Sequence, residues 1–345
     1  MKVLVPVEDI FFGSAVASFI ARHQWPPQTE FRIINVVDPY FLEQPKLLPF
    51  GSLIECSHED IVLYAKDVVK QIADLVEQAL PSVSVTHEVI KGFVKDQIVA
   101  IAKDWQADMI VAGSHGRSGF NRFILGSTSI ILISQAPCPV LLVKPDAKTL
   151  KLWDTIESDA VTVKPNALNL FRKYNNQVRN KILIAVDETD MSDQVVDFVI
   201  NHHWTAPASF KLLSVAKPAN ELKFLPIATL SALYEDALKV RTGSMRSLAL
   251  KLRDHYHLPN VEEEILQGDP KKTIVEAAKQ WGADLIVVGC HVREPLEKLV
   301  VGSVSLAVLC TAPCSVLLLR QKGKTGKLQK SPLSTQDQAM FVATP

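Results

Sequence analysis

The chain carries the same sequence pattern twice, with an offset of 176 residues between the two copies. Aligned without a gap, residues 89–143 and 265–319 are identical at 23 of 55 positions. Near the start of each copy the offset is 179, as Lys2–Val7 and Lys181–Val186 show, so the first copy holds three extra residues between its second and third predicted strands. This period is far longer than the roughly 20–50 residues of a solenoid repeat. Each copy is therefore predicted to be a whole domain.

The length of the chain fits this interpretation, because 345 residues suffice for two domains of about 150 residues each. The repeat places the two domains at residues 1–146 and 180–321. Residues 147–179 are predicted to be a linker. Residues 322–345, whose first part is rich in lysine, are predicted to be a disordered tail.

The composition argues against several classes of protein. Lysine plus arginine and aspartate plus glutamate both number 37, so the formal net charge is zero, whereas nucleic-acid-binding domains usually carry a basic excess. A hydrophobic content of 48% supports a packed core, and five cysteines are too few for a disulfide framework. Glu8 and Asp9 interrupt the first apolar run, so no signal peptide is predicted. We expect a cytoplasmic protein without a nucleic-acid partner.

Two uncharged stretches of 21 residues, 123–143 and 299–319, have the length of a membrane span. Each contains Gly-Ser near its start and Ala-Pro-Cys in its second half, and a proline ends a helix. We therefore interpret each stretch as a helix, a turn and a short buried strand, and we expect no contact with a membrane.

Strands and helices are predicted to alternate in the same order in both copies. Most of the predicted strands are runs rich in Val, Ile and Leu, which are typical of a parallel sheet buried on both faces, and strict βαβ alternation indicates a doubly wound α/β domain. These strands cover residues 3–7, 32–37, 85–90, 109–112 and 140–143, and then 182–186, 211–215, 262–266, 285–288 and 316–319. A ligand of such a sheet binds beyond the carboxyl ends of the strands, where the strand order reverses.

The segment after the fourth strand of the first copy has the residues of a phosphate site. Gly113-Ser-His-Gly leaves the strand, and Gly126-Ser-Thr-Ser opens the next helix. Glycines let the backbone approach an anion closely, the start of a helix favours phosphate, and the hydroxyls are additional donors. In the alternative, structural interpretation the glycines only form tight turns and Ser127 only caps the helix. We favour phosphate binding.

Spaced as G-x2-G-x9-G-[ST], this segment resembles the nucleotide motif of the universal stress protein family. A carboxylate after the opening strand, a glycine after the third strand (Gly92, Gly268) and Ala-Pro-Cys before the last strand also match. The resemblance covers residues 1–145 and 180–321. It implies two Rossmann-like, adenine-nucleotide α-hydrolase-like domains, each with a five-stranded parallel sheet of order 3-2-1-4-5 and helices on both faces. It also implies ATP with Mg²⁺ as the ligand, and pairing through the last strands within the chain or in a homodimer.

The resemblance assigns roles to residues by their position in each copy. Pro6 and Glu8 match the exit of the first strand, which contacts the ribose or base, and Val36 matches the apolar residue that closes on adenine. The implied phosphate loop of the first copy consists of Gly113, His115, Gly116, Gly126, Ser127, Thr128 and Ser129. The possible, weak second site consists of Ala185, Asp187, Val215, Gly289, His291, Gly302, Ser303 and Ser305.

The two copies depart from the family pattern in different ways. The first copy has the complete glycine motif, but Glu8 stands where the family has aspartate, so that either its longer side chain or Asp9 supplies the carboxylate. The second copy keeps Asp187 but has Val292 in place of the second glycine, and valine disfavours a positive φ. Its loop also contains two glutamates, whereas the loop of the first copy contains two arginines and no acid. Because like charges repel a triphosphate, ATP is predicted to bind mainly in the first domain.

Together these features predict an ATP-binding regulatory protein of the stress response, with slow hydrolysis at most. No P-loop or acidic Mg²⁺ cluster is visible, no partner group marks His115 or His291 as a base, and Pro313 separates Cys310 from Cys314, so no catalytic or metal-binding residue is predicted. Two alternatives stay open. One is an enzyme of the adenine-nucleotide α-hydrolase group, although the Ser-Gly-Gly stretch of that group is missing. The other is an interaction scaffold without nucleotide.

Overall fold

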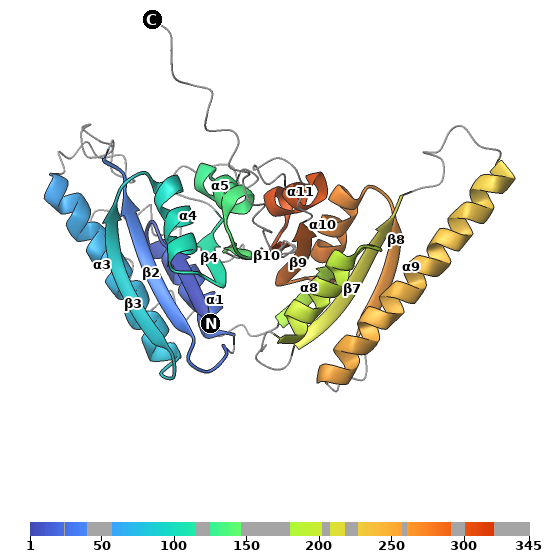
Figure 1. Cartoon of the computed structure of the whole chain (residues 1–345), viewed down its shortest axis with the longest axis horizontal. Helices are drawn as coiled ribbons and strands as arrows, with labels where there is room; N and C mark the ends of the chain where they lie inside the picture. Colours follow the sequence, from blue (N-terminus) through green and yellow to red (C-terminus); the bar gives the residue numbers. More distant parts are fainter. Residues whose placement is uncertain are drawn as a thin grey trace, which may run out of the picture.

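One continuous ten-stranded sheet runs through both halves of the chain (Figure 1). The structure is a computed structural model, and it describes residues 1–23, 25–39, 57–114, 125–145, 180–201, 208–217, 227–256, 261–290 and 301–320. The predicted linker, the predicted tail and the loop residues His115, Gly116 and His291 lie outside these ranges.

Strands and helices alternate in both halves, with strand bounds within three residues of the predicted ones. The first half contains β1 (Lys2–Pro6), α1 (Ile10–Ala21), β2 (Glu30–Val37), α3 (His58–Ala79), β3 (Ser84–Lys91), α4 (Val94–Asp104), β4 (Met109–Gly113), α5 (Ser127–Gln135) and β5 (Val140–Val143). The second half contains β6 (Asn180–Ala185), α8 (Asp190–Asn201), β7 (Ala208–Ala216), α9 (Ile227–Tyr256), β8 (Glu262–Gln267), α10 (Pro270–Trp281), β9 (Leu285–Cys290), α11 (Ser303–Thr311) and β10 (Ser315–Arg320).

The strand order is β3-β2-β1-β4-β5-β10-β9-β6-β7-β8. Neighbouring strands within each half are parallel, so both halves have the predicted order 3-2-1-4-5. The order reverses between β1 and β4 in the first half and between β6 and β9 in the second. The carboxyl ends of these strand pairs are therefore the places where a sheet of this kind binds a ligand.

The two halves meet at β5 and β10, which pair in antiparallel fashion. Leu141 lies opposite Leu317 in this pair, and the two residues occupy the same position of the repeat, 176 residues apart. The junction thus has an approximate two-fold symmetry, like the isologous interface of a symmetric dimer.

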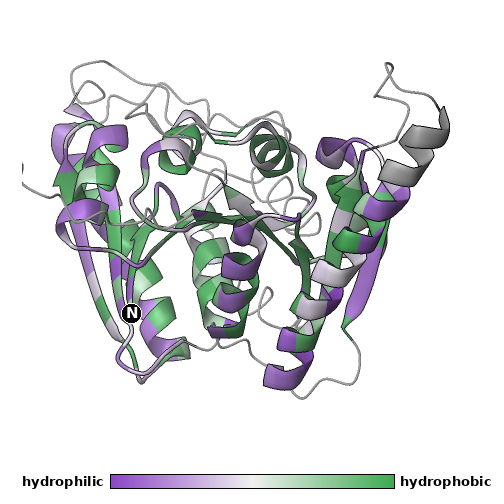
Figure 2. Cartoon of the chain, turned by 45° about the vertical axis from the view of Figure 1, so that its right-hand side comes forward, coloured by the Kyte–Doolittle hydropathy of each residue, from purple (hydrophilic) through white to green (hydrophobic). Residues whose placement is uncertain are grey.

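Both faces of the inner strands are buried under helices, as continuous apolar strands require, whereas the residues of the edge strands β3 and β8 are exposed or half-buried. Along β1, Val3 and Val5 point into one core cluster and Leu4 into the other, since successive strand residues face opposite sides. Each cluster includes residues of both halves, and the green, apolar strands between the helices are visible in Figure 2. One two-sided core therefore continues across the junction.

The two uncharged stretches form the predicted helix, turn and strand, as α5 with β5 and α11 with β10. In the part of the chain that the structure describes, no helix has both the length and the apolar character needed to cross a bilayer.

Candidate functional site

A buried asparagine of β2 holds the chain where it leaves β1. The Nδ2 atom of Asn35 donates hydrogen bonds to the carbonyl oxygens of Val7 (2.9 Å) and Glu8 (3.2 Å), and the Val7 amide donates to the Ile34 carbonyl at 2.9 Å. Asn35 is only 6% exposed, so this amide fixes the loop that follows Pro6. Our sequence reasoning missed Asn35; a lone polar residue in an apolar strand run was the available signal.

The two carboxylates that follow β1 have different roles. Asp9 caps the first turn of α1, because its Oδ1 accepts a hydrogen bond from the Phe12 amide at 2.9 Å, and it is buried. Asp9 therefore does not take the place of the family aspartate, which the sequence left open. Glu8 is exposed, and it is the carboxylate at the surface of this strand end.

Helix α5 begins directly beside the end of β4. Gly126 is its N-cap, and no side chain caps the amide groups of its first turn in the described part of the chain. The hydroxyl of Ser129 donates to the carbonyl oxygens of Gly113 (3.4 Å) and Ser114 (3.3 Å), and the Gly126 amide donates to Ser114 at 3.4 Å. These bonds fix the first turn of α5 at the carboxyl end of β4, where its unpaired amide groups can bind an anion.

The hydroxyl groups at the start of α5 differ in exposure. Ser127 is exposed and Thr128 is half-buried, so both can contact a ligand. Ser129 is buried, and its hydroxyl already bonds to the strand carbonyls. The structure therefore gives the Ser129 side chain a positioning role, and it places Gly126 rather than Ser127 at the cap of the helix.

The second half repeats this local structure. Gly302 is the N-cap of α11, no side chain among the described residues caps that helix, and the Ser305 hydroxyl donates to the Gly289 carbonyl at 2.8 Å. Ser303 is exposed, as Ser127 is. The two helix starts are therefore alike, and the halves differ elsewhere.

Gly289, which the resemblance places in the second loop, has a packing role. A Cβ atom at this position would overlap with Cγ of Met191, which is buried in α8. Overpacking of this kind costs about 1–3 kcal/mol, so we expect Gly289→Ala to lower the free energy of unfolding by that amount in urea titrations.

Gly243 provides the control for this prediction. It lies in α9, and a Cβ atom added there would have nothing within 4 Å, so Gly243→Ala is expected to raise the free energy of unfolding by about 0.5–1 kcal/mol. Equal stability of the Gly289→Ala variant and the parent protein would contradict the packing role.

An arginine of α9 bridges the ends of β6 and β7 in the second half. Nη1 of Arg241 donates to Oγ of Ser214 (2.8 Å) and to the carbonyl oxygen of Val215 (2.9 Å). Nη2 lies 2.5 Å from Oε1 of Glu188, and the Arg241 side chain is 17% exposed. Val215 is the residue assigned to adenine contact, so Arg241 occupies the adenine side of the second site.

In the first half, a residue that cannot form such a bridge occupies the corresponding position of the helix. With the offset of 176, Arg241 corresponds to Ala65 of α3, which is 3% exposed; with the offset of 179, Ser214 corresponds to Asn35. The short Asn35 amide thus ties β2 to the loop after β1, and the alanine of α3 has no polar group that could bridge to these strand ends. Val36, the counterpart of Val215, is half-buried at the end of β2.

The Asp187 carboxylate of the second site is exposed, but hydrogen bonds from Thr189 and Ser192 hold it in place. Oδ1 of Asp187 accepts hydrogen bonds from the Thr189 amide (3.0 Å), the Thr189 hydroxyl and the Ser192 hydroxyl (3.0 Å). Beside it lies a hollow of about 180 Å³, lined by Asp187, Glu188, Thr189, Asp190, Ser192, Asp193, Ser244, Ser247 and Leu248. Its described lining contains four carboxylates, of which Glu188 pairs with Arg241 and Asp193 with Lys251, so the lining residues include no Lys or Arg that could bind a triphosphate.

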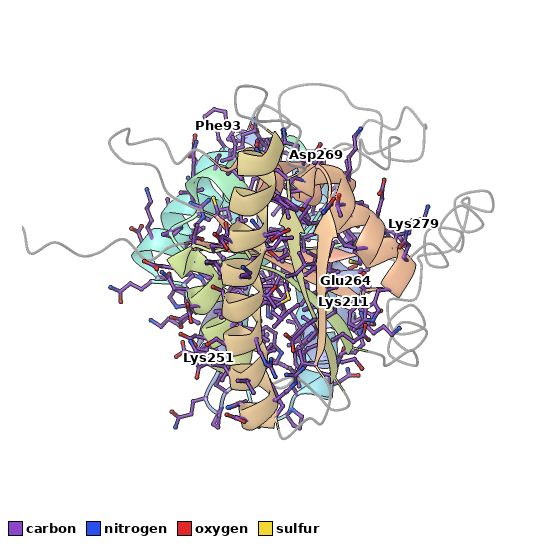
Figure 3. All side chains as sticks on the ribbon, turned by 90° about the vertical axis from the view of Figure 1, so that its right-hand side faces the viewer. Phe93, Lys211, Lys251, Glu264, Asp269 and Lys279 are labelled. Carbon is purple, nitrogen blue, oxygen red and sulfur yellow. The ribbon has the colours of Figure 1, made fainter. Side chains whose placement is uncertain are left out.

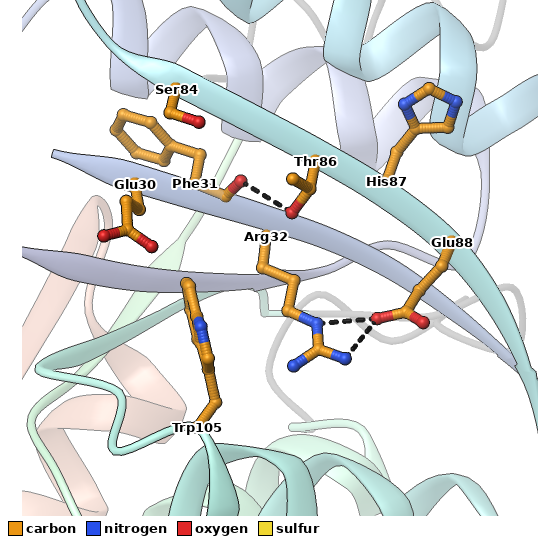
Figure 4. A pocket seen from close by; sticks show the side chains of 8 residues that line it. All are labelled: Glu30, Phe31, Arg32, Ser84, Thr86, His87, Glu88 and Trp105. Carbon is orange, nitrogen blue, oxygen red and sulfur yellow. Dashed lines mark hydrogen bonds and ion pairs between the residues drawn. The ribbon is translucent and has the colours of Figure 1, made fainter.

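In the first half, a hollow of about 350 Å³ lies beside the amino-terminal parts of β2 and β3, away from the strand ends that adjoin α5 (Figure 4). It lies between residues of β2, β3 and Trp105, and within it Arg32 lies 2.6 Å from Glu88. In the second half, Lys211 forms the equivalent ion pair with Glu264 at 3.0 Å (Figure 3). This repeated pair braces the outer strands and is remote from the start of α5.

The described cysteines do not have the properties of a reactive or metal-binding site. Burial raises the pKa of the Cys138 thiol and of the Cys314 thiol to about 12, so both are protonated at neutral pH, whereas the thiolate is the reactive form. Across the described ranges, no group of three or more His, Cys, Asp or Glu side chains could hold a metal ion.

Comparisons with known proteins agree with the fold. The sequence profile of the universal stress protein family matches residues 1–144 and 179–320. A universal stress protein of Mycobacterium tuberculosis is 27% identical over 325 residues, which cover 92% of this chain and 97% of that protein. The crystal structure of a universal stress protein from Archaeoglobus fulgidus DSM 4304 has a TM-score of 0.58 at 17% identity and covers 93% of this chain and 98% of that one. A universal stress protein in complex with cAMP covers 42% of this chain, with 20% identity and a TM-score of 0.30.

Proposed function

Because the chain belongs to the universal stress protein family, we propose that it is a regulatory protein that binds ATP in its first half. The observation that carries this proposal is the start of α5. Its glycine cap leaves the amide groups of the first turn without side-chain partners among the described residues, and Ser129 fixes that turn at the end of β4. Such a turn binds phosphate through its amides and its dipole.

In this proposal the nucleotide lies across the point where the strand order reverses. The phosphates bind the first turn of α5 and the hydroxyls of Ser127 and Thr128, together with the loop that contains His115 and Gly116. The ribose lies near Glu8, and the adenine lies between Pro6 and Val36. Mg²⁺ enters with ATP as the counter-ion of its phosphates.

We further propose that the second half binds ATP weakly or not at all. Arg241 bridges Val215 and Glu188 on the adenine side, and the hollow beside Asp187 is acidic. The valine and the two glutamates of its loop act in the same direction on the phosphate side. The first half lacks the Arg241 bridge, because alanine occupies the corresponding position of α3.

The nucleotide acts as a ligand that shifts the protein between conformations or partners, which requires that the two states differ in their affinity for it. We assign no residue to catalysis. The same family comparison supports a role in the stress response, where binding rather than rapid turnover transmits the signal.

The content of the purified protein tests this proposal. The full chain is purified without added nucleotide and extracted with acid, and the extract is separated by chromatography; we expect ATP. AMP or ADP together with a second product would indicate an enzyme of the adenine-nucleotide α-hydrolase group instead. An empty extract, followed by no detectable binding in a titration with Mg-ATP, would indicate a scaffold without nucleotide and contradict the proposal.

A further inference from the structure

Each half of the chain places a cation from the end of its last strand against a helix of the other half. Nζ of Lys144, which follows β5, donates to the carbonyl oxygens of Ala312 (2.9 Å) and Cys310 (3.5 Å) at the end of α11. Nη2 of Arg320, the last residue of β10, donates to the carbonyl oxygens of Leu132 (3.3 Å) and Ile133 at the end of α5. Lys144 and Arg320 are 176 residues apart and thus occupy the same position of the repeat.

Arg320 supplies a hydrogen bond that α5 cannot make for itself. In a helix the Ile133 carbonyl would accept from the amide four residues later, but that residue is Pro137, which has no N–H group. Ile133 is 1% exposed, so water has little access, and an unsatisfied buried carbonyl is costly. The neighbouring Leu132 carbonyl already accepts from the Ala136 amide at 3.0 Å. The guanidinium therefore donates the hydrogen bond that the Ile133 carbonyl would otherwise lack, and it places a positive charge at the negative end of the helix dipole.

This cap acts on the helix that carries the proposed phosphate site. Helix α5 has nine residues and no basic residue of its own in the last turn, and helices this short are not stable alone in water. Besides the packing of Leu132 and Ile133 into the core, two polar anchors hold it: the Ser129 hydroxyl at its start, which bonds to β4, and Arg320 at its end. The geometry of the first turn depends on both.

We propose that Arg320, a residue of the second half, is a positioning residue for the ATP site of the first half. This inference rests on the proposed function. Arg320 does not touch the ligand, because the carbonyl groups that it contacts belong to Leu132 and Ile133, five and six residues after Ser127, which is about 8–9 Å along the helix at 1.5 Å per residue. The second half, which we propose to bind ATP weakly or not at all, thus supports the site of its neighbour.

The test compares Arg320→Met with its repeat equivalent, Lys144→Met, in the full chain. Binding of Mg-ATP and of adenosine is measured by displacement of a labelled ATP analogue. We expect Arg320→Met to bind ATP about five-fold more weakly and to bind adenosine within two-fold of the parent protein, because only the phosphates contact α5. Lys144→Met, which removes the cap of α11, is expected to leave both affinities unchanged.

Two further variants separate positioning from a loss of structure. Arg320→Lys keeps the charge and is expected to restore most of the ATP affinity, and Arg320→Gln keeps a donor without charge and is expected to lie between. Equal losses for ATP and adenosine, equal losses in the Lys144→Met variant, or no loss in Arg320→Met would each overturn the inference. Absence of ATP binding by the parent protein would instead refute the proposed function, so the two failures are distinguishable.

Discussion

Replacing Ser127 by glutamate is expected to weaken ATP binding by at least about 100-fold. Ser127 is the exposed first residue of α5, and a carboxylate there faces the phosphates in the first turn. Two unit charges about 4 Å apart near a protein surface repel by about 4 kcal/mol, and about 2.7 kcal/mol already corresponds to 100-fold in affinity. Acids at a helix start stabilise the helix by about 0.3–1 kcal/mol, so the variant is expected to stay folded. Isothermal titration with Mg-ATP measures the effect.

The repeat provides a matched control for this substitution. Ser303 is the exposed first residue of α11 and follows a glycine cap, as Ser127 does. Ser303→Glu introduces the same charge at the same position of the other half, and we expect the affinity for ATP to stay within two-fold of the parent value. A large loss in Ser303→Glu, or none in Ser127→Glu, would place the nucleotide elsewhere.

Removing the arginine that bridges the second site is expected to destabilise the protein without weakening ATP binding. Arg241→Ala removes the partner of the exposed Glu188 carboxylate and the donor to the Val215 carbonyl and to the buried Ser214 hydroxyl, and a buried polar group that loses its partner costs about 1–3 kcal/mol. We expect the free energy of unfolding to fall by about 2 kcal/mol in urea titrations, with an unchanged ATP affinity in the first half.

Lys239→Ala is the control in the same helix. Lys239 pairs with Asp236 at 3.1 Å, but both side chains are about three-quarters exposed, at 75% and 73%. Exposed pairs contribute little, so this variant is expected to have the stability of the parent protein. Arg241→Ala with the same stability as Lys239→Ala would show that the bridge has no structural role, and a loss of ATP affinity would connect it to the first site.

Much of the fold was predictable because the signals were strong and repeated. Continuous apolar runs predicted strands that are buried on both faces, and the observed core clusters confirm this. The proline of each Ala-Pro-Cys step converted two apparent membrane spans into helix and strand, and α5 with β5 and α11 with β10 have this form. The sequence predicted that Gly126 and Ser127 open this helix, and in the structure Gly126 is the N-cap and Ser127 the first residue of α5.

The side chains that distinguish the two halves could not be predicted in the same way. Asn35 and Arg241 act through contacts with residues about 28 and 26 positions away, and Arg320 acts across 187 positions. Arg241 lies on a long helix, where an arginine is usually solvated. Only the packing of α9 against the end of β7 brings its side chain to the Val215 carbonyl. The sequence offered Asp9 only as an alternative to Glu8, and its role as the cap of α1, through the amide of Phe12, emerged from the structure.

The number of ATP molecules bound per chain tests the central claim most directly. Equilibrium dialysis of the full chain with Mg-ATP, at concentrations well above the dissociation constant, is expected to give one ATP per chain. Under the same conditions we expect one for Ser303→Glu and none for Ser127→Glu. Two ATP molecules per chain, or one that persists in Ser127→Glu and disappears in Ser303→Glu, would contradict the assignment of the nucleotide to the first half.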